Sequence, residues 1–394
     1  MVNYLKFLVG AHNSMNVIDL FSGVGGLSLG ASRAGFDVKA AVEIDSHAMA
    51  SHALNFPKSV HIQEDISTLT AQSIREKIGS HVNIDGIIGG PPCQGFSYIG
   101  KGDPNDSRNE LYTHFFRLVS EFKPSFFLAE NVPGIMQEKF RPLREKALSL
   151  VSGEYNILSP IKVKASDYGA PTIRTRIFFI GIKKGMGNIS EDAFRPVGVK
   201  PITVKEALLG LPNDVDCNIS DEMVGWRKIE KNIIGDFYSH LWARIPYGVG
   251  NKEAIEKLTF GYVSGCQGTV HTDQVIKRYE NLSFGQIDKI SRSARLDPNG
   301  FCPTLRAGTG SDKGSYQALR PIHPYTNRVI TPREAARMQG FPDWFQFHTT
   351  KWHSFRQIGN SVSPIVAEAM LLPLAKLFSD DSYNCTFENQ GIAL

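Results

Sequence analysis

The chain has 394 residues, of which 42% are hydrophobic and 21% charged, and a formal net charge of +4. This composition is typical of a soluble globular protein with one large or two ordinary domains. The five cysteines form no Cys-x-x-Cys pair and their number is odd, which argues against a disulfide framework or a zinc site. No apolar run approaches membrane-spanning length, so we expect a cytoplasmic protein without a membrane span.

The first third of the chain alternates short apolar strands with helical stretches. Residues 1–14 are a short N-terminal extension before Met15. The pattern then predicts strands at 16–20, 39–44, 85–90 and 125–129, a Gly-rich turn at 21–26, and helices at 27–34 and 111–121. Such alternation indicates an α/β fold, with a parallel sheet covered on both faces and a ligand site beyond the carboxyl ends of the strands.

From about Lys183 to Arg328 this pattern gives way to short segments broken by Gly, Pro, Asn and Asp. Helical periodicity returns at 332–339 and 362–378. We therefore expect one domain built from 15–182 and 330–378, an irregular inserted domain at 183–329, and a tail at 379–394. Seven basic and two acidic residues lie between Lys289 and Arg328, an excess that fits either a solvated face or a phosphate-contacting surface.

The turn after the first strand contains Gly23, Gly25 and Gly26, which let the backbone approach a ligand closely. A dinucleotide fingerprint has a third glycine where this chain has Ser28, which favours a nucleoside cofactor without a pyrophosphate. Glu43, at the end of the second strand, is placed to hold both ribose hydroxyls, and Asp65 to accept a hydrogen bond from an adenine amino group. Taken alone, these features also fit a tight turn with a surface acid.

Residues 89–97 read Gly-Gly-Pro-Pro-Cys-Gln-Gly-Phe-Ser. A lone cysteine is more often a small buried hydrophobic residue than a nucleophile. Cys93, however, follows two prolines at a strand end and precedes a polar, Gly-rich stretch, so we expect an exposed thiol beside a loop.

With this segment the chain resembles the DNA cytosine-5 methyltransferases of bacterial and phage restriction–modification systems. The family's motifs follow in family order: the Gly-rich turn, the segment around Cys93, Glu130-Asn-Val, Arg174-Thr-Arg176 and two closing motifs at 333–342 and 357–362. The resemblance covers roughly 15–182 and 330–378. It implies an S-adenosylmethionine-dependent methyltransferase (Rossmann-like) sheet with an inserted target-recognition domain, and double-stranded DNA as the partner of a monomer. The family often has Gln where this chain has Thr172, which puts one supporting contact in doubt.

The resemblance also assigns roles. Cys93 attacks carbon 6 of a flipped-out cytosine so that carbon 5 can take a methyl group from S-adenosylmethionine. Glu130, protonated or sharing a proton, serves ring nitrogen 3 and the exocyclic amine, while Arg174 and Arg176 serve the carbonyl oxygen and the architecture around the thiol. The residues expected at the cofactor are Phe21, Gly23, Gly25, Glu43, Ile44, Asp65, Ile66, Pro92, Leu111, Asn360 and Val362. Those expected at DNA are Gln94, Ser97, Thr304, Leu305, Arg306 and Lys313, the last four in a reader segment at 302–316.

Three functions fit these motifs. A site-specific DNA methyltransferase is favoured, and it would protect DNA from a cognate restriction enzyme. A tRNA-methylating relative is disfavoured because that group keeps the inserted region compact. A catalytically dead homologue is disfavoured because Cys93, Glu130, Arg174 and Arg176 are all present. The eleven histidines show no ligand spacing and the methyl donor is already activated, so we expect no metal.

Overall fold

One mixed β-sheet organises the chain, in a computed structural model that describes residues 15–92, 109–215, 225–230, 236–242, 244–307 and 320–379. The strand order is β3-β2-β1-β4-β5-β8-β6, and β7 also pairs with β8. The strands are β1 (Asn16–Leu20), β2 (Asp37–Val42), β3 (Val60–Ile62), β4 (Gly86–Gly89), β5 (Phe126–Asn131), β6 (Tyr155–Ile157), β7 (Ile161–Lys164) and β8 (Thr175–Lys183).

The expectation of a parallel sheet is confirmed for the first five strands only. Strands β3, β2, β1, β4 and β5 pair in parallel, whereas β8 runs antiparallel to β5, and β6 and β7 run antiparallel to β8. The strands β6, β7 and β8, which lie beyond the strands predicted from the sequence, follow one another without a crossover helix between them, and this allows the antiparallel direction. Strand β3 was also absent from the expected elements.

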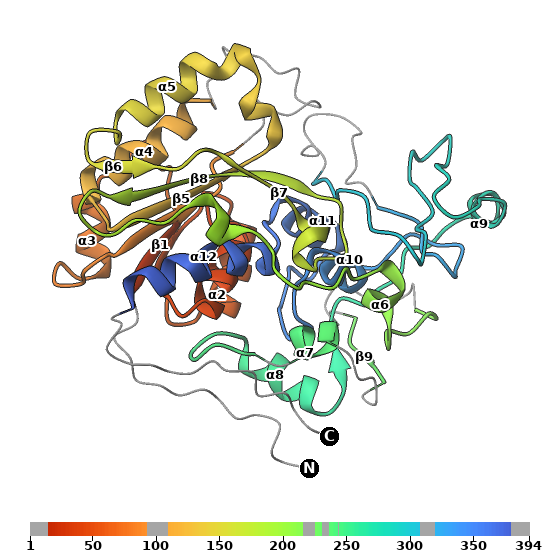
Figure 1. The fold of residues 1–394 in the computed structure, drawn as a ribbon. Helices are drawn as coiled ribbons and strands as arrows, with labels where there is room; N and C mark the ends of the chain where they lie inside the picture. The colour runs from red at the N-terminus through yellow and green to blue at the C-terminus, as the bar shows by residue number, and fades with distance from the viewer. Residues whose placement is uncertain are drawn as a thin grey trace.

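Helices cover both faces of the sheet (Figure 1). They are α1 (Gly26–Arg33), α2 (Ser46–Asn55), α3 (Ala71–Ile78), α4 (Glu110–Phe122), α5 (Arg141–Ser149) and α12 (Pro364–Phe378). Alternate strand residues enter two separate cores: Val17 and Ile88 pack toward α1 and α12, whereas Ile18 and Ile87 pack toward α4. This period of two is what a sheet buried on both faces requires.

The C-terminal helix α12 packs against α1 near the start of the chain, as the sequence predicts. A Cβ added at Gly30 of α1 would lie 2.3 Å from Ala367 Cβ, so glycine permits this close helix contact. The stretch Lys351–Phe378 corrects the expectation of no apolar run of spanning length, because its length and composition would allow a span. It comprises two helices, however, and 61% of its most apolar window is buried inside the protein.

The segment between β8 and α10 is irregular, as expected. Its elements are short: α6 (Val204–Leu208), β9 (Arg227–Lys228), α7 (Asp236–Trp242), α8 (Lys252–Thr259), β10 (Tyr262–Val263) and α9 (Asp273–Glu280). Many of its apolar residues join one core cluster with α10 (Pro332–Gln339), α12 and the aromatic residues at 341–347. Helices α7 and α8 lie below the sheet in Figure 1, and α9 lies at the right edge of the view, away from the sheet.

Candidate active site

In the Gly-rich turn that follows β1, the backbone adopts a conformation that few residues adopt. Phe21 has φ 60° and Gly23 has φ 55°, both in the left-handed region. A Cβ built on Gly23 meets no atom within 4 Å, so open space lies beside this backbone. A Cβ at Gly26 would instead lie 2.2 Å from the carbonyl oxygen of Val362. Glycine at 26 therefore lets the turn touch the closing motif, and glycine at 23 leaves room for a ligand.

Glu43, directly after β2, is tied to this turn. Its Oε2 accepts from the Gly23 N–H at 2.9 Å and its Oε1 from the Asp45 N–H at 2.9 Å. Burial raises the pKa of the Glu43 carboxyl, and these backbone hydrogen bonds oppose that rise. The adjacent Ile44 is 64% exposed, an unusual state for isoleucine. An acid fixed beside open backbone, next to an exposed apolar side chain, fits the ribose and base of a nucleoside cofactor.

Asp65 and Ile66 follow β3 and differ in exposure. Asp65 is exposed and accepts from the Ser67 N–H at 2.9 Å, and hydrogen bonds from Ser67 lower the pKa of its carboxyl. Ile66 is buried in the core below α4, and its carbonyl accepts from Arg117 Nη2 at 3.0 Å. Asp65 therefore offers a side chain to a ligand, whereas the side chain of Ile66 is committed to packing.

The chemical end of the site centres on an ion pair between neighbouring strands. Arg176 Nε lies 2.6 Å from Glu130 Oε1, and the two side chains are 14% and 11% exposed. This pairing follows from the strand order, because β8 runs antiparallel beside β5 and sets the Arg176 guanidinium against the Glu130 carboxylate.

Glu130 also lies next to the segment that leads to Cys93. A Cβ on Gly90 would lie 3.1 Å from Glu130 Oε2, and Asn131 Nδ2 donates to the Pro91 carbonyl at 3.3 Å. Pro92 is half-buried and is the last described residue before the cysteine. Cys93, Gln94 and Ser97 lie outside the described residues. The chain therefore enters the predicted nucleophile segment directly beside Glu130 and Asn131.

Arg174 is buried and joins three segments of the chain. Its Nη1 donates to the Leu305 carbonyl at 3.1 Å and its Nη2 to the Asn360 carbonyl at 3.4 Å. Thr172, where the family often has Gln, donates through Oγ1 to the Cys302 carbonyl at 3.0 Å. Arg174 thus fits the expected role in the architecture, and Thr172 supplies a contact to the predicted reader segment.

The expected DNA-reading residues divide by exposure. Arg306 is exposed and Thr304 half-buried, so both offer polar atoms to a partner. Leu305 is 2% exposed and belongs to the hydrophobic core, which corrects its expected place at DNA: a side chain packed in the core has no surface to offer. Lys313 lies outside the described residues. Leu305 instead anchors the segment through its side chain and its carbonyl.

The remaining expected cofactor residues lie on separate elements. Gly25 takes φ 103° before α1, and Leu111 is half-buried at the start of α4. Asn360 is exposed at the end of α11 (Lys351–Asn360), and Val362 follows it. These elements are held together by the close approach of Gly26 to the Val362 carbonyl and by two hydrogen bonds, one from Gly23 to Glu43 and one from Arg174 to Asn360.

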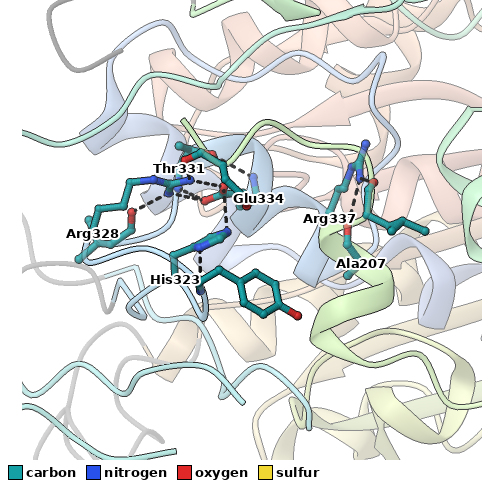
Figure 2. A network of polar contacts seen from close by, with 10 residues as sticks. Ala207, His323, Arg328, Thr331, Glu334 and Arg337 are labelled. Atoms are coloured by element: carbon teal, nitrogen blue, oxygen red, sulfur yellow. Dashed lines mark hydrogen bonds and ion pairs between the residues drawn. The ribbon is translucent and has the colours of Figure 1, made fainter. Parts of the chain in front are cut away.

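Helix α10, the first closing motif, carries buried charges with many partners (Figure 2). Arg328 Nη1 and Nη2 donate to the two Glu334 carboxylate oxygens at 2.9 and 2.7 Å, and the Thr331 N–H donates to the same carboxylate at 2.7 Å. Arg337 reaches the Ala207 carbonyl of the inserted segment at 3.1 Å and pairs with Asp343. This helix therefore fastens the inserted segment to the rest of the fold.

Two polar groups escaped the sequence analysis because their members are far apart in the chain. Ser28 Oγ donates to Asp19 Oδ2 at 2.6 Å and lies 3.0 Å from His52 Nε2, whose ring in turn lies 3.0 Å from His61. Burial raises the pKa of Asp19 to about 7 and lowers that of His52 well below its usual value.

The second group consists of His47, His348 and His353, whose candidate ligand atoms all lie within 4.8 Å of one another. This group is a candidate ligand set that spacing along the chain does not reveal. No spacing signal links residue 47 to residues 348 and 353.

Comparisons with known proteins agree with this geometry. Residues 15–376 match the family model for C-5 cytosine-specific DNA methylases. Type II methyltransferase M.XorII of Xanthomonas oryzae pv. oryzae is 40% identical over 369 residues, covering 90% of this chain and 82% of that protein. Type II methyltransferase M.DdeI of Desulfomicrobium norvegicum is 32% identical over 391 residues, covering 90% of this chain and 87% of that protein.

Solved structures show the same relationship. A crystal structure of a prophage-encoded E. coli protein, described as a DNA modification methyltransferase, is 63% identical with a TM-score of 0.85, and covers 92% of this chain and 99% of that one. S. pombe Dnmt2 methyltransferase shares the fold at 18% identity and a TM-score of 0.60, over 92% of this chain and 99% of that one. The chain therefore belongs to the C-5 cytosine-specific DNA methylase family and is a DNA (cytosine-5-)-methyltransferase of the restriction–modification type.

Proposed function

We propose that this enzyme methylates carbon 5 of a cytosine flipped out of double-stranded DNA, through a covalent adduct with Cys93, at one short DNA sequence. The observation that carries the proposal is the ion pair of Glu130 and Arg176, set against the Gly90–Pro92 backbone that leads to the cysteine. A stacked base cannot reach such a recessed strand end, so the base must leave the duplex.

The Cys93 thiolate forms a bond to cytosine carbon 6, and the ring electrons shift toward carbon 5 and nitrogen 3. The Glu130 carboxyl, protonated on Oε2, donates a hydrogen bond at nitrogen 3, while Arg176 contacts its other oxygen, Oε1, and holds it in place. After carbon 5 has gained the methyl group, a base removes its proton, and the returning electrons expel the thiolate.

The proposed methyl donor is S-adenosylmethionine, whose sulfonium supplies an activated methyl group. Gly23 offers open backbone space and Glu43 a fixed carboxylate for the ribose, while the exposed Ile44 offers a surface for the adenine. Asp65 is available to the adenine amino group, and Asn360 and Val362 close the site from the C-terminal side. Phe21, Gly25, Ile66, Pro92 and Leu111 complete the proposed lining, Ile66 through its backbone.

We propose that the segment 183–329 recognises the target sequence and that Gln94 and Ser97 contact DNA beside the flipped base. Arg306 and Thr304 are placed on the surface next to Arg174, with Lys313 further along the same segment. An arginine reads guanine edges or binds phosphate, and phosphate is the commoner contact. The enzyme is proposed to act as a monomer on DNA in the bacterial cytoplasm.

The test is transfer of label from S-adenosylmethionine to unmethylated double-stranded DNA or to tRNA. Label is expected in DNA alone, lost in Cys93→Ser and retained in Cys385→Ser, which removes a thiol outside the motif. Label in tRNA alone, in neither nucleic acid, or in DNA with Cys93→Ser would contradict the proposal. Bisulfite sequencing is expected to show one short sequence context, and methylation of cytosines in every context would contradict a target-recognition role.

A restriction–modification role predicts protection. DNA methylated by the enzyme is challenged with a nuclease that cuts the sequence found by bisulfite sequencing. Resistance to cutting is expected, whereas DNA treated with Cys93→Ser is cut normally. Complete cutting of fully methylated DNA would contradict the protective role while leaving the methyltransferase activity intact.

A further inference from the structure

Three histidines from opposite ends of the chain meet at the surface. His47 lies in the first turn of α2, His348 in the loop before α11, and His353 in the first turns of α11. Their ring centroids are 4.8 Å apart for His47–His348, 3.9 Å for His47–His353 and 4.4 Å for His348–His353. His47 Nδ1 lies 3.1 Å from His348 Nε2. One ring nitrogen from each residue thus lies within 4.8 Å of the other two.

The neighbouring charged groups are engaged elsewhere. Asp45 accepts from the His47 and Ala48 N–H groups at 3.0 Å, which caps α2, and its other oxygen lies 3.3 Å from Arg356 Nη1. Lys351 donates to the Gly268 carbonyl at 2.6 Å. The cluster thus offers three imidazoles as its ligand set, and no carboxylate belongs to this group among the residues that the structure describes.

We propose that His47, His348 and His353 bind one divalent transition-metal ion, Zn²⁺, with the remaining coordination position open to solvent. Imidazole nitrogen is a preferred ligand of zinc, copper and nickel, and three histidines with an open position form a known type of zinc coordination. Ligand nitrogens ~2.05 Å from a tetrahedral ion lie ~3.4 Å apart. The three atoms, now within 4.8 Å of one another, reach that spacing by small side-chain rotations.

His348 sets the proton requirement of the site. Its Nδ1 accepts from the Thr350 N–H at 3.0 Å and lies 3.1 Å from Thr350 Oγ1, so the ring proton is on Nε2. Metal binding through Nε2 moves this proton to Nδ1, where Thr350 Oγ1 can accept it. The Thr350 N–H favours the Nε2–H tautomer, so metal binding gives up this backbone hydrogen bond and gains the contact with Thr350 Oγ1 in its place. Thr350 Oγ1 is thus a positioning group for the metal-bound ring.

The ion would fasten α2 to α11. Gln357 of α11 already joins these helices, because its Nε2 donates to the His47 carbonyl at 3.0 Å and its Oε1 accepts from the His348 N–H at 2.9 Å. Helix α2 begins just after Glu43, and α11 ends at Asn360. A metal at the three histidines therefore stabilises the contact between two segments that flank the proposed cofactor site, and it stabilises the folded chain by mass action.

The experiment uses the full chain without a polyhistidine tag, stripped with chelator and titrated calorimetrically with ZnCl2 alone at neutral pH. One saturable site per chain is expected, together with a rise in melting temperature. His47→Ala and His353→Ala are expected to weaken zinc binding at least tenfold. The control His81→Ala, which removes an exposed histidine elsewhere, is expected to leave the affinity unchanged.

Thr350→Val is expected to weaken zinc binding about tenfold, the lower end of the range for an outer-shell partner. Visible absorption of the Co²⁺-loaded chain supplies a second readout, with the band pattern of tetrahedral coordination expected in the native chain and lost in His353→Ala. Absence of saturable zinc uptake would overturn the proposal. Saturable uptake that survives both His47→Ala and His353→Ala would overturn it equally, because the ion would then bind elsewhere.

Discussion

The carboxyl edge of the sheet and helix α10 both hold charged side chains away from bulk water, but they do so differently. At the sheet edge, Glu130 and Arg176 face each other and remain 11% and 14% exposed beside a segment that leads to Cys93. At α10, Arg337 and Asp343 are 0% exposed, and Arg337 also donates to two carbonyls of the inserted segment. Charges at α10 are committed to the fold, whereas those at the sheet edge remain open to a ligand.

Breaking the α10 network should have the largest effect on stability. Arg337→Ala leaves the Asp343 carboxylate buried without its guanidinium, which costs about 3–5 kcal/mol in the free energy of unfolding. Denaturant unfolding monitored by circular dichroism measures the loss. Arg195→Ala, on an exposed ion pair, is the matched control and should leave the melting temperature unchanged. Equal stability of Arg337→Ala and the native protein would refute the structural role of this network.

Substitution at the sheet edge should instead affect activity. Glu130→Gln removes the acid at ring nitrogen 3 and the ion pair with Arg176, so we expect methyl transfer to fall roughly 10²–10⁴-fold. The melting temperature should change far less than in Arg337→Ala. Glu154→Gln, which breaks an exposed ion pair with Lys123, serves as control and should keep full activity. Native-level methylation by Glu130→Gln would remove Glu130 from the mechanism.

The buried carboxyl of Asp19 in β1 offers a test that depends on pH. Burial raises its pKa from 3.8 to about 7, so the folded state favours the protonated form. Its stabilising contribution is therefore full below about pH 4 and is lost as the pH rises through about 7. Between about pH 4 and pH 7 the native protein should lose stability as the pH rises, by up to about 1.4 kcal/mol per pH unit, whereas Asp19→Asn should not. The stability of Asp19→Asn relative to the native protein should therefore rise across this range. Urea unfolding at several pH values checks this, and parallel curves would contradict it.

The smallest expected effects come from two helix caps of the same design. Thr331 of α10 is buried and Thr70 of α3 exposed, and each forms a capping box with the residue three positions later. Thr331→Ala should cost about 1–2 kcal/mol and Thr70→Ala about 0.5–1 kcal/mol, because water can replace the lost cap only at the exposed site. A larger loss at Thr70 than at Thr331 would remove the distinction between the two regions.

The sequence predicts the regular parts of the fold because they depend on local patterns. The first strand, 16–20, and the helix 332–339 agree with β1 and α10 residue for residue. The Gly23 turn and Glu43 also come together as expected, since both follow neighbouring parallel strands. The antiparallel direction of β8 does not follow from its own residues, because strand direction depends on the connection and the partner strand.

The site could be predicted only where its residues stand in motifs. The motifs predict that Glu130, Arg174 and Arg176 share one site, but they do not predict the partners of these residues. Arg176 lies against Glu130 because β8 runs beside β5, and Arg174 reaches the Leu305 carbonyl across a gap of 131 residues in the sequence. The sequence places Leu305 at DNA because burial cannot be judged from the residue type alone. The histidine cluster joins residues about 300 positions apart, a distance at which spacing carries no signal.

The covalent step at Cys93 is tested most directly with DNA in which the target cytosine carries fluorine at carbon 5. Fluorine replaces the proton that must leave, so the enzyme should remain bonded to DNA once the methyl group has been transferred. We predict a complex that survives denaturing electrophoresis, requires S-adenosylmethionine, and is absent with Cys93→Ser. Methylation of ordinary DNA by an enzyme that forms no such complex would contradict the proposed mechanism.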